Sequence, residues 1–306
     1  MRRQPIERVT VRAPAKVNLH LSVGRRRTDG FHDLTTVFQA VGLYDELDAT
    51  PADALTVEVS GEGAADVPTD SANLAVRAAA LLGMETGRSP AVALTIRKGI
   101  PVAGGCAGGS ADAAAALVAC DALWGTGLSR AELTKLAARL GSDVPFALHG
   151  GTALGTGRGE LLTPVLGHGT YSWVLALVEG GLSTPEVYDE LDRQRDSGPV
   201  SVVSDPAGVL SALRSGDAVA LGRALTNDLQ PAAIALRPPL RVLLETGADL
   251  GALGSLVSGS GPTVAFLARS DDHAVALVAA LAGQGVCRAV RRADGPVPGA
   301  RIVEIA

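Results

Sequence analysis

Three polar residues in two short segments have the types and the spacing that suit chemistry on a hydroxyl or phosphate group. Lys16 and Asn18 lie two apart in Ala-Pro-Ala-Lys-Val-Asn-Leu, so on a strand their side chains share one face. Asp143 lies in Gly-Ser-Asp-Val-Pro-Phe, at a predicted helix start. A carboxylate that faces a lysine can accept a hydroxyl proton while the ammonium holds it ionised. The alternatives are a surface strand for the first two residues and a helix cap for Asp143.

A glycine-rich segment at residues 101–116 is the most informative stretch of the chain. Four glycines and Ser110 precede an alanine-rich run, and a predicted strand at residues 91–97 comes before them. This order favours phosphate binding, because backbone N–H groups and the positive end of the helix dipole can face the anion. A tight connection made of small residues is the alternative. No Gly-Lys-Ser/Thr follows, which excludes a Walker loop.

Two further observations bear on the same site. The segment Val-Ser-Gly-Ser-Gly-Pro-Thr, residues 257–263, separates two predicted strands. It is either a plain hairpin turn or a second loop that closes the phosphate site from the other half of the chain. The chain also has only three lysines, Lys16, Lys98 and Lys135. Because arginine supplies positive charge elsewhere, Lys16 and Lys98 are candidates for positions that need a compact ammonium.

The predicted elements place these residues at strand and helix ends. Hydrophobic patterning and turn residues indicate strands and helices in alternation in the second half, as in a split βαβ sheet. In the first half, a turn or bulge is expected between the first two strands, next to Lys16. The predicted strands are residues 9–12, 17–23, 35–41, 45–50, 54–60, 91–97, 172–178, 253–258, 263–268 and 286–291, and the main helices are 72–86, 110–123, 129–140, 185–195 and 271–282.

Length and composition narrow the class of protein. The 306 residues suffice for two domains, and a net charge of −5 argues against a nucleic-acid partner. No apolar run reaches the roughly 18 residues of a membrane helix, and the N-terminal residues lack the apolar core of a signal peptide. Three distant cysteines make neither a disulfide framework nor a zinc site. We therefore expect a cytoplasmic protein with neither membrane nor nucleic-acid partners.

Taken together, these segments resemble the GHMP kinase superfamily. Residues 101–110, Pro-Val-Ala-Gly-Gly-Cys-Ala-Gly-Gly-Ser, are similar to its ATP loop, with Cys106 and Ala107 where Leu-Gly is usual. The resemblance implies an α+β, two-domain GHMP kinase fold. The N-terminal α/β domain, residues 1–158, would carry the ATP loop, and the C-terminal ferredoxin-like domain, residues 159–306, would close the site. It also implies ATP as phosphoryl donor with Mg²⁺, whose ligands stay unassigned.

Within the superfamily, four segments are similar to the branch that phosphorylates the 2-hydroxyl of a cytidine diphosphate-linked methylerythritol for isoprenoid synthesis. They are residues 13–21, 27–34, 108–113 and 141–145, and Arg-Thr-Asp-Gly-Phe-His-Asp-Leu at 27–34 is the most discriminating. The resemblance implies that Asp143 takes the hydroxyl proton and Lys16 orients the reacting groups. It implies substrate contacts from Asn18, Phe31, His32, Thr184, Pro185 and Tyr188. It implies ATP contacts from Asn73, Lys98, Pro101, Val102, Ala103, Gly104, Gly105, Cys106, Ala107, Gly108, Gly109, Ser110 and Ala111.

Two alternatives stay open at this point. The chain could be a GHMP kinase for another small alcohol such as homoserine or mevalonate, which would have no use for Phe31, His32 and Tyr188. It could also be a catalytically silent binding protein of the same fold, although Lys16 and Asp143 are both present. An aromatic residue in a polar turn favours the cytidine-linked substrate over both alternatives, because Phe31 can stack on a base there. The oligomeric state cannot be predicted.

Overall fold

Two long antiparallel strands run through the middle of the molecule and position most of the site. The computed structural model describes residues 6–102, 104–197 and 204–306. The first strand is continuous through Lys16, and its register shifts between Pro14 and Ala15, so the expected break there is a bulge. These two strands belong to a sheet made of β1 (Val9–Arg26), β2 (His32–Pro51), β3 (Thr56–Gly61), β4 (Val92–Lys98), β5 (Thr152–Thr156), β6 (Leu161–Pro164), β8 (Thr226–Asn227) and β12 (Arg301–Ile305).

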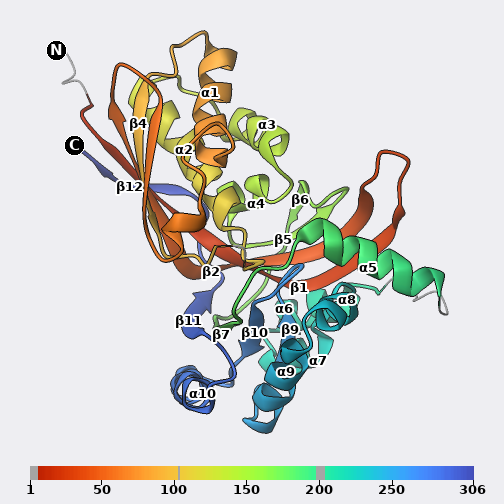
Figure 1. Cartoon of the computed structure of the whole chain (residues 1–306). Coiled ribbons are helices and arrows are strands. Elements are labelled where there is room, and N and C mark those ends of the chain that lie inside the picture. Colours follow the sequence, from red (N-terminus) through yellow and green to blue (C-terminus); the bar gives the residue numbers. More distant parts are fainter. Residues whose placement is uncertain (1–5, 103, 198–203) are drawn as a thin grey trace.

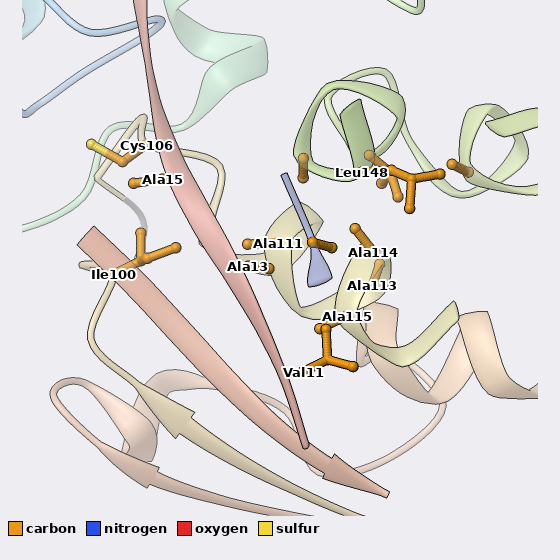
Figure 2. Close-up of a cluster of buried hydrophobic side chains, with 14 of the residues drawn as sticks. Val11, Ala13, Ala15, Ile100, Cys106, Ala111, Ala113, Ala114, Ala115 and Leu148 are labelled. Atoms are coloured by element: carbon orange, nitrogen blue, oxygen red, sulfur yellow. The ribbon is translucent and has the colours of Figure 1, made fainter. Parts of the chain in front are cut away.

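The first group of helices packs against this sheet (Figure 1). It comprises a short 3₁₀ helix, η1 (Ala64–Asp66), and α1 (Leu74–Thr86), α2 (Gly108–Trp124), α3 (Arg130–Leu140) and α4 (Val144–His149). The α2 helix is buried on nearly all sides, because its alanines allow close approach to β1. Figure 2 shows Ala111, Ala113 and Ala115 of α2 beside Val11 and Ala13 of β1.

The second half of the chain forms a smaller sheet of four antiparallel strands. Its strands are β7 (Tyr171–Leu177), β9 (Gly254–Val257), β10 (Val264–Leu267) and β11 (Ala289–Gly295), in the spatial order β11-β7-β10-β9. In chain order this is 4-1-3-2, with helices in the first and last connections, and it confirms the expected ferredoxin-like arrangement. The helices are α5 (Thr184–Asp196), α6 (Ala207–Ser215), α7 (Ala218–Ala224), α8 (Gln230–Leu236), α9 (Pro239–Asp249) and α10 (Asp271–Gln284).

The two halves are interleaved in the chain. The expected boundary at residue 158 lies in the turn between β5 and β6, which pair with each other in the larger sheet. The last strand, β12, also returns to that sheet and pairs with β1. The division into residues 1–158 and 159–306 stays a prediction. In the described part of the chain, none of the helices has both the length and the apolarity of a membrane span.

Candidate active site

A cavity of about 780 Å³ is lined by both halves of the chain and contains most of the predicted site residues. The glycine loop and Asn73 line one part of it, β1 contributes Lys16 and Asn18, β2 contributes His32, and α5 contributes Tyr188. Segments that are far apart in the sequence therefore meet in one space. The predicted site residues that line this cavity are Lys16, Asn18, Phe31, His32, Asn73, Lys98, Pro101, Val102, Gly104, Gly105, Ala107, Gly108, Gly109, Ser110, Asp143, Thr184, Pro185 and Tyr188.

Lys16 and Asp143 face each other in this cavity. The Lys16 ammonium lies 3.8 Å from Oδ2 of Asp143 and donates a hydrogen bond to Oδ1 of Asn18 at 2.6 Å. Asp143 is the N-terminal cap position of α4, but its side chain makes no capping hydrogen bond. The cap interpretation of this carboxylate is therefore wrong, and the carboxylate stays available to a bound molecule.

The amide of Asn18 is fixed on both sides. Its oxygen accepts from Lys16, and its nitrogen donates to Oγ1 of Thr36 at 2.9 Å. The Thr36 hydroxyl in turn donates to the backbone oxygen of His20 at 2.7 Å. Lys16 and Asn18 share one face of β1, as predicted, and the chain of hydrogen bonds holds the ammonium in place with little side-chain freedom.

Lys98 belongs to a buried group of three charged residues that the sequence did not reveal. Its ammonium donates to Oδ2 of Asp45 and to Oδ2 of Asp112, both at 2.5 Å. Asp45 also accepts from the backbone N–H groups of Gly99 and Ile100 at 2.7 and 2.8 Å. These contacts tie the end of β4 to the start of the glycine loop and to α2. The predicted contact of Lys98 with a nucleotide stays a prediction, because its ammonium is already shared by two carboxylates.

The charges in this group are unequal. Burial acts to lower the pKa of Lys98, but Asp112 and Asp45 outweigh it, so the pKa is raised and the ammonium stays charged. Burial raises the pKa of Asp112 to about 7; Lys98 opposes this rise and Asp45 adds to it. Oδ1 of Asp112 is buried and has no hydrogen-bond partner among the described residues. One lysine is thus shared by two buried carboxylates, and Asp112 is the one whose pKa is raised.

The glycine loop is constrained by its own backbone conformation and by a contact from the second half of the chain. Ala107, immediately before α2, has φ 61°, the left-handed conformation that favours glycine. Gly105 has φ 73°, and a Cβ there would lie 2.2 Å from the backbone oxygen of Ser258. The Ser258 hydroxyl donates to the Gly105 oxygen at 3.2 Å. The segment at 257–263 is thus both the β9–β10 hairpin turn and a cover on the glycine loop.

Three predicted ATP-loop or nucleotide residues have side chains engaged elsewhere. Cys106 and Ala111 belong to the hydrophobic core, not to the lining of the cavity (Figure 2). Asn73 lines the cavity, but its Oδ1 accepts from the Ala75 N–H and its Nδ2 donates to the Pro68 oxygen. The side chain of Asn73 therefore caps α1. Ala103 lies outside the described residues.

Aromatic side chains gather at the other end of the cavity. The rings of His32 and Tyr188 lie 5.0 Å apart, and the Arg158 guanidinium lies 5.0 Å from the ring centre of Phe31. Phe31 is 51% exposed, so core packing does not account for it. Burial and then the charge of Asp143 raise the pKa of Tyr188, which keeps its phenol neutral. Exposed and half-buried rings of this kind can stack on a flat ligand.

Residues from the second half complete this end of the cavity. The Thr184 hydroxyl lies 2.9 Å from that of Ser260, which joins the start of α5 to the 257–263 turn. His32 contacts Asp192 of α5 through Nε2 at 3.0 Å. Neither Arg158 nor Asp192 was predicted, because both depend on contacts between segments far apart in the chain.

Comparison with known proteins identifies the relatives of this arrangement. Two family models match, "GHMP kinases N terminal domain" over residues 73–151 and "GHMP kinases C terminal" over residues 209–287. The 4-diphosphocytidyl-2-C-methyl-D-erythritol kinase of Nocardia farcinica (strain IFM 10152) is 62% identical over 296 residues, which is 97% of this chain and 96% of the relative. The same-named protein of Mycobacterium tuberculosis (strain ATCC 25618 / H37Rv) is 56% identical over 98% of this chain and 94% of its own.

Solved structures agree with these relatives. A crystal structure of a 4-(cytidine 5'-diphospho)-2C-methyl-D-erythritol kinase superposes with a TM-score of 0.76 at 34% identity, over 93% of this chain and 98% of the other. The homoserine kinase of Cytophaga hutchinsonii superposes with a TM-score of 0.78 at 18% identity, over 99% of each chain. At that identity the second likeness shows a shared fold alone.

Proposed function

This chain belongs to the GHMP kinase superfamily and, within it, to the 4-diphosphocytidyl-2-C-methyl-D-erythritol kinases, and we propose on that basis that it transfers the γ-phosphoryl group of ATP to the 2-hydroxyl of 4-diphosphocytidyl-2-C-methyl-D-erythritol. It is an ATP-dependent small-molecule kinase of the non-mevalonate isoprenoid pathway. The observation that carries the site assignment is that Lys16 and Asp143 share one cavity with the glycine loop and the aromatic residues. A cytoplasmic location stays a prediction.

In this proposal Asp143 accepts the proton of the attacking hydroxyl. The acceptor is a tertiary alcohol, which is hindered and weakly nucleophilic. Phosphoryl transfer passes through a loose transition state, so positioning and charge neutralisation supply most of the catalysis. Lys16 lies 3.8 Å from Asp143 and is suited to orient the carboxylate and to neutralise charge on the transferred group. The hydrogen bonds of Asn18 support a positioning role toward Lys16, besides the phosphate contact predicted for it.

The glycine loop is proposed to hold the ATP phosphates. Backbone N–H groups at the start of α2 and the positive end of its dipole suit an anion. Within the described ranges, no cluster of three His, Cys, Asp or Glu residues could hold a resident metal. Mg²⁺ is usually held by substrate phosphates plus one or two carboxylates, and Asp112 and Asp143 line the cavity together with the glycine loop, so these carboxylates would fit Mg²⁺ that arrives with ATP. When bound, Mg²⁺ would neutralise phosphate charge.

The aromatic end of the cavity is proposed to hold the cytosine. Phe31 and Tyr188 would stack on the base, and His32 offers a ring nitrogen to its edge. Thr184 and Pro185 at the start of α5 would contact the same substrate. The relatives at 62% and 56% identity favour this substrate over homoserine or mevalonate.

The test is an assay of ADP release by the purified protein with ATP and Mg²⁺. The cytidyl substrate is compared with homoserine and mevalonate, and Asp143→Asn serves as the inactive control. Release with the cytidyl compound alone is the expected result. Release with another alcohol would contradict the cytosine pocket, and no release with any acceptor would favour a silent binding protein.

A further inference from the structure

Asp192 makes a contact that the proposed reaction does not use. Its two carboxylate oxygens lie 3.0 and 3.2 Å from Nε2 of His32. The His32 side chain is only 5% exposed, whereas that of Asp192 is 25% exposed. His32 is the first residue of β2, and Asp192 lies on α5. The contact therefore links the two halves of the chain at the aromatic end of the cavity.

This contact decides which ring nitrogen of His32 carries the proton. An ionised carboxylate can only accept hydrogen bonds, so Nε2 must be the donor. In the neutral ring the other nitrogen, Nδ1, is then an acceptor. The hydrogen bonds of the ring within the described ranges all involve Nε2. Nδ1 is thus left to a ligand, as an atom that accepts and does not donate.

The same helix turn positions the stacking ring. Tyr188 and Asp192 are four residues apart on α5 and so share one face of the helix. Tyr188 lies against the His32 ring with 5.0 Å between centroids and a tilt of 38°. One face of α5 therefore supplies both the ring that would stack on the base and the carboxylate that orients the histidine. The Arg26 guanidinium lies 3.9 Å from the Asp192 carboxylate, so the two opposite charges attract each other.

We infer that Asp192 is a positioning residue that fixes the Nε2–H form of His32 and thereby selects cytosine over uracil. The inference rests on the proposed function. Cytosine has an amine donor at position 4, where uracil has a carbonyl acceptor. An acceptor at Nδ1 bonds to the amine, whereas it meets the uracil carbonyl as a second acceptor with no proton between them. A buried polar group left unpaired in this way is a strong source of discrimination.

The first experiment measures base selectivity. The ratio of kcat/KM for the cytidyl substrate to that for its uridyl analogue is determined for the wild type, for Asp192→Asn and for Asp196→Asn. Asparagine at position 192 can donate its N–H to Nε2 and so permits the other tautomer, with Nδ1 as the donor. We expect the ratio to fall about tenfold or more in Asp192→Asn, mainly through KM, because an amide no longer imposes one tautomer. Asp196→Asn, on the same helix but outside the cavity lining, should keep the wild-type ratio.

The second experiment reads the tautomer directly and needs no turnover. Nitrogen-15 chemical shifts of the His32 ring should show a protonated Nε2 and an unprotonated Nδ1 in the wild type, and loss of that state in Asp192→Asn. A protonated Nδ1 in the neutral wild-type ring, or an unchanged selectivity ratio in Asp192→Asn, would overturn the inference. If the wild type fails to phosphorylate the cytidyl substrate, the proposed function itself is wrong. An active enzyme whose base selectivity does not depend on Asp192 would instead overturn only the present inference.

Discussion

The ammonium of Lys16 and the carboxylate of Asp143 lie 3.8 Å apart, although β1 and α4 bring them from distant parts of the chain. Lys16 is 7% exposed in its side chain and is held by Asn18, whereas Asp143 is 32% exposed and makes no capping hydrogen bond. One partner is thus fixed and the other is open to the cavity. This asymmetry suits a carboxylate that must approach a substrate hydroxyl.

Asp143→Asn should abolish most of the turnover without harming the fold. We expect kcat to fall by about 10²–10⁴-fold, the usual contribution of a general base, with ATP affinity retained. The carboxylate caps nothing but faces the buried Lys16 ammonium at 3.8 Å, so the free energy of unfolding should fall by no more than about 1 kcal/mol. Steady-state kinetics, ATP titration and denaturant unfolding measure the three quantities. Near-normal turnover would contradict the base assignment.

The sequence made the local parts of the site predictable. A strand at 92–98 precedes the glycine loop and a helix at 108–124 follows, as the periodicity and the glycines indicated. Lys16 and Asn18 share a face because alternation along a strand is a local property. Family resemblance supplied the fold and the roles of the distant segments.

Contacts that depend on long-range packing could not be predicted. Asp112 stands in an alanine-rich helix and Asp45 in an ordinary strand, and only the folded chain brings both to Lys98. Asp192 lies in a charged helix, α5, where nothing marks it apart from its neighbours. The sequence predicted a turn or a bulge near Pro14 but could not decide between them. The structure has a bulge, because a register shift lets the proline stay in a continuous strand. These features follow from tertiary packing, which local patterns do not encode.

Ala107→Gly should stabilise the protein. An L-residue in the left-handed conformation costs about 1–2 kcal/mol, and glycine removes this strain. Glycine also loses more backbone entropy on folding, which offsets about 0.5–1 kcal/mol of the gain. We expect the free energy of unfolding to rise by about 0.5–1 kcal/mol. Ala115→Gly, in the buried interior of α2, is the matched control and should lose about 1 kcal/mol or more. A destabilised Ala107→Gly would show that the Ala107 methyl group packs favourably enough to offset the strain.

Gly105→Ala should disrupt the glycine loop. A Cβ at this position meets the Ser258 oxygen at 2.2 Å, and φ is 73°, so both steric overlap and backbone strain oppose it. We expect a loss of about 2 kcal/mol or more in the free energy of unfolding, together with a raised KM for ATP.

Gly283→Ala provides the contrast for that substitution. Nothing lies within 4 Å of a Cβ at Gly283, which is part of α10. There the change should stabilise by about 0.4–1 kcal/mol and leave the KM for ATP unaltered. Equal effects of the two substitutions on stability would mean that the packing of the 257–263 turn against the glycine loop does not restrict residue 105. Denaturant unfolding and initial-rate kinetics on both variants decide this.

Asp112 should make stability depend on pH near neutrality. Burial raises the pKa of Asp112 to about 7 in the folded state, against about 3.9 in an unfolded chain. Between these values the folded state binds the extra proton, so stability must fall as pH rises. The contribution is complete below about pH 3.9 and is lost as pH passes through 7. Asp112→Asn removes the titration while its amide oxygen still accepts from Lys98.

The test compares the free energy of unfolding of both proteins at pH 5, 6, 7 and 8. The wild type should lose stability relative to Asp112→Asn as the pH rises, most steeply between pH 5 and 6, and the loss should level off above pH 7. Parallel curves for the two proteins would show that Asp112 is already ionised at pH 5, with Lys98 balancing both carboxylates. Asp121→Asn is the control, because Asp121 lies in the same helix but is hydrogen-bonded to Thr126 and the Leu128 N–H. This variant keeps Asp112, so its stability curve should run parallel to that of the wild type and lie below it. A pH-dependent gap confined to Asp112→Asn would place the titrating proton in the group that joins β4 to the glycine loop.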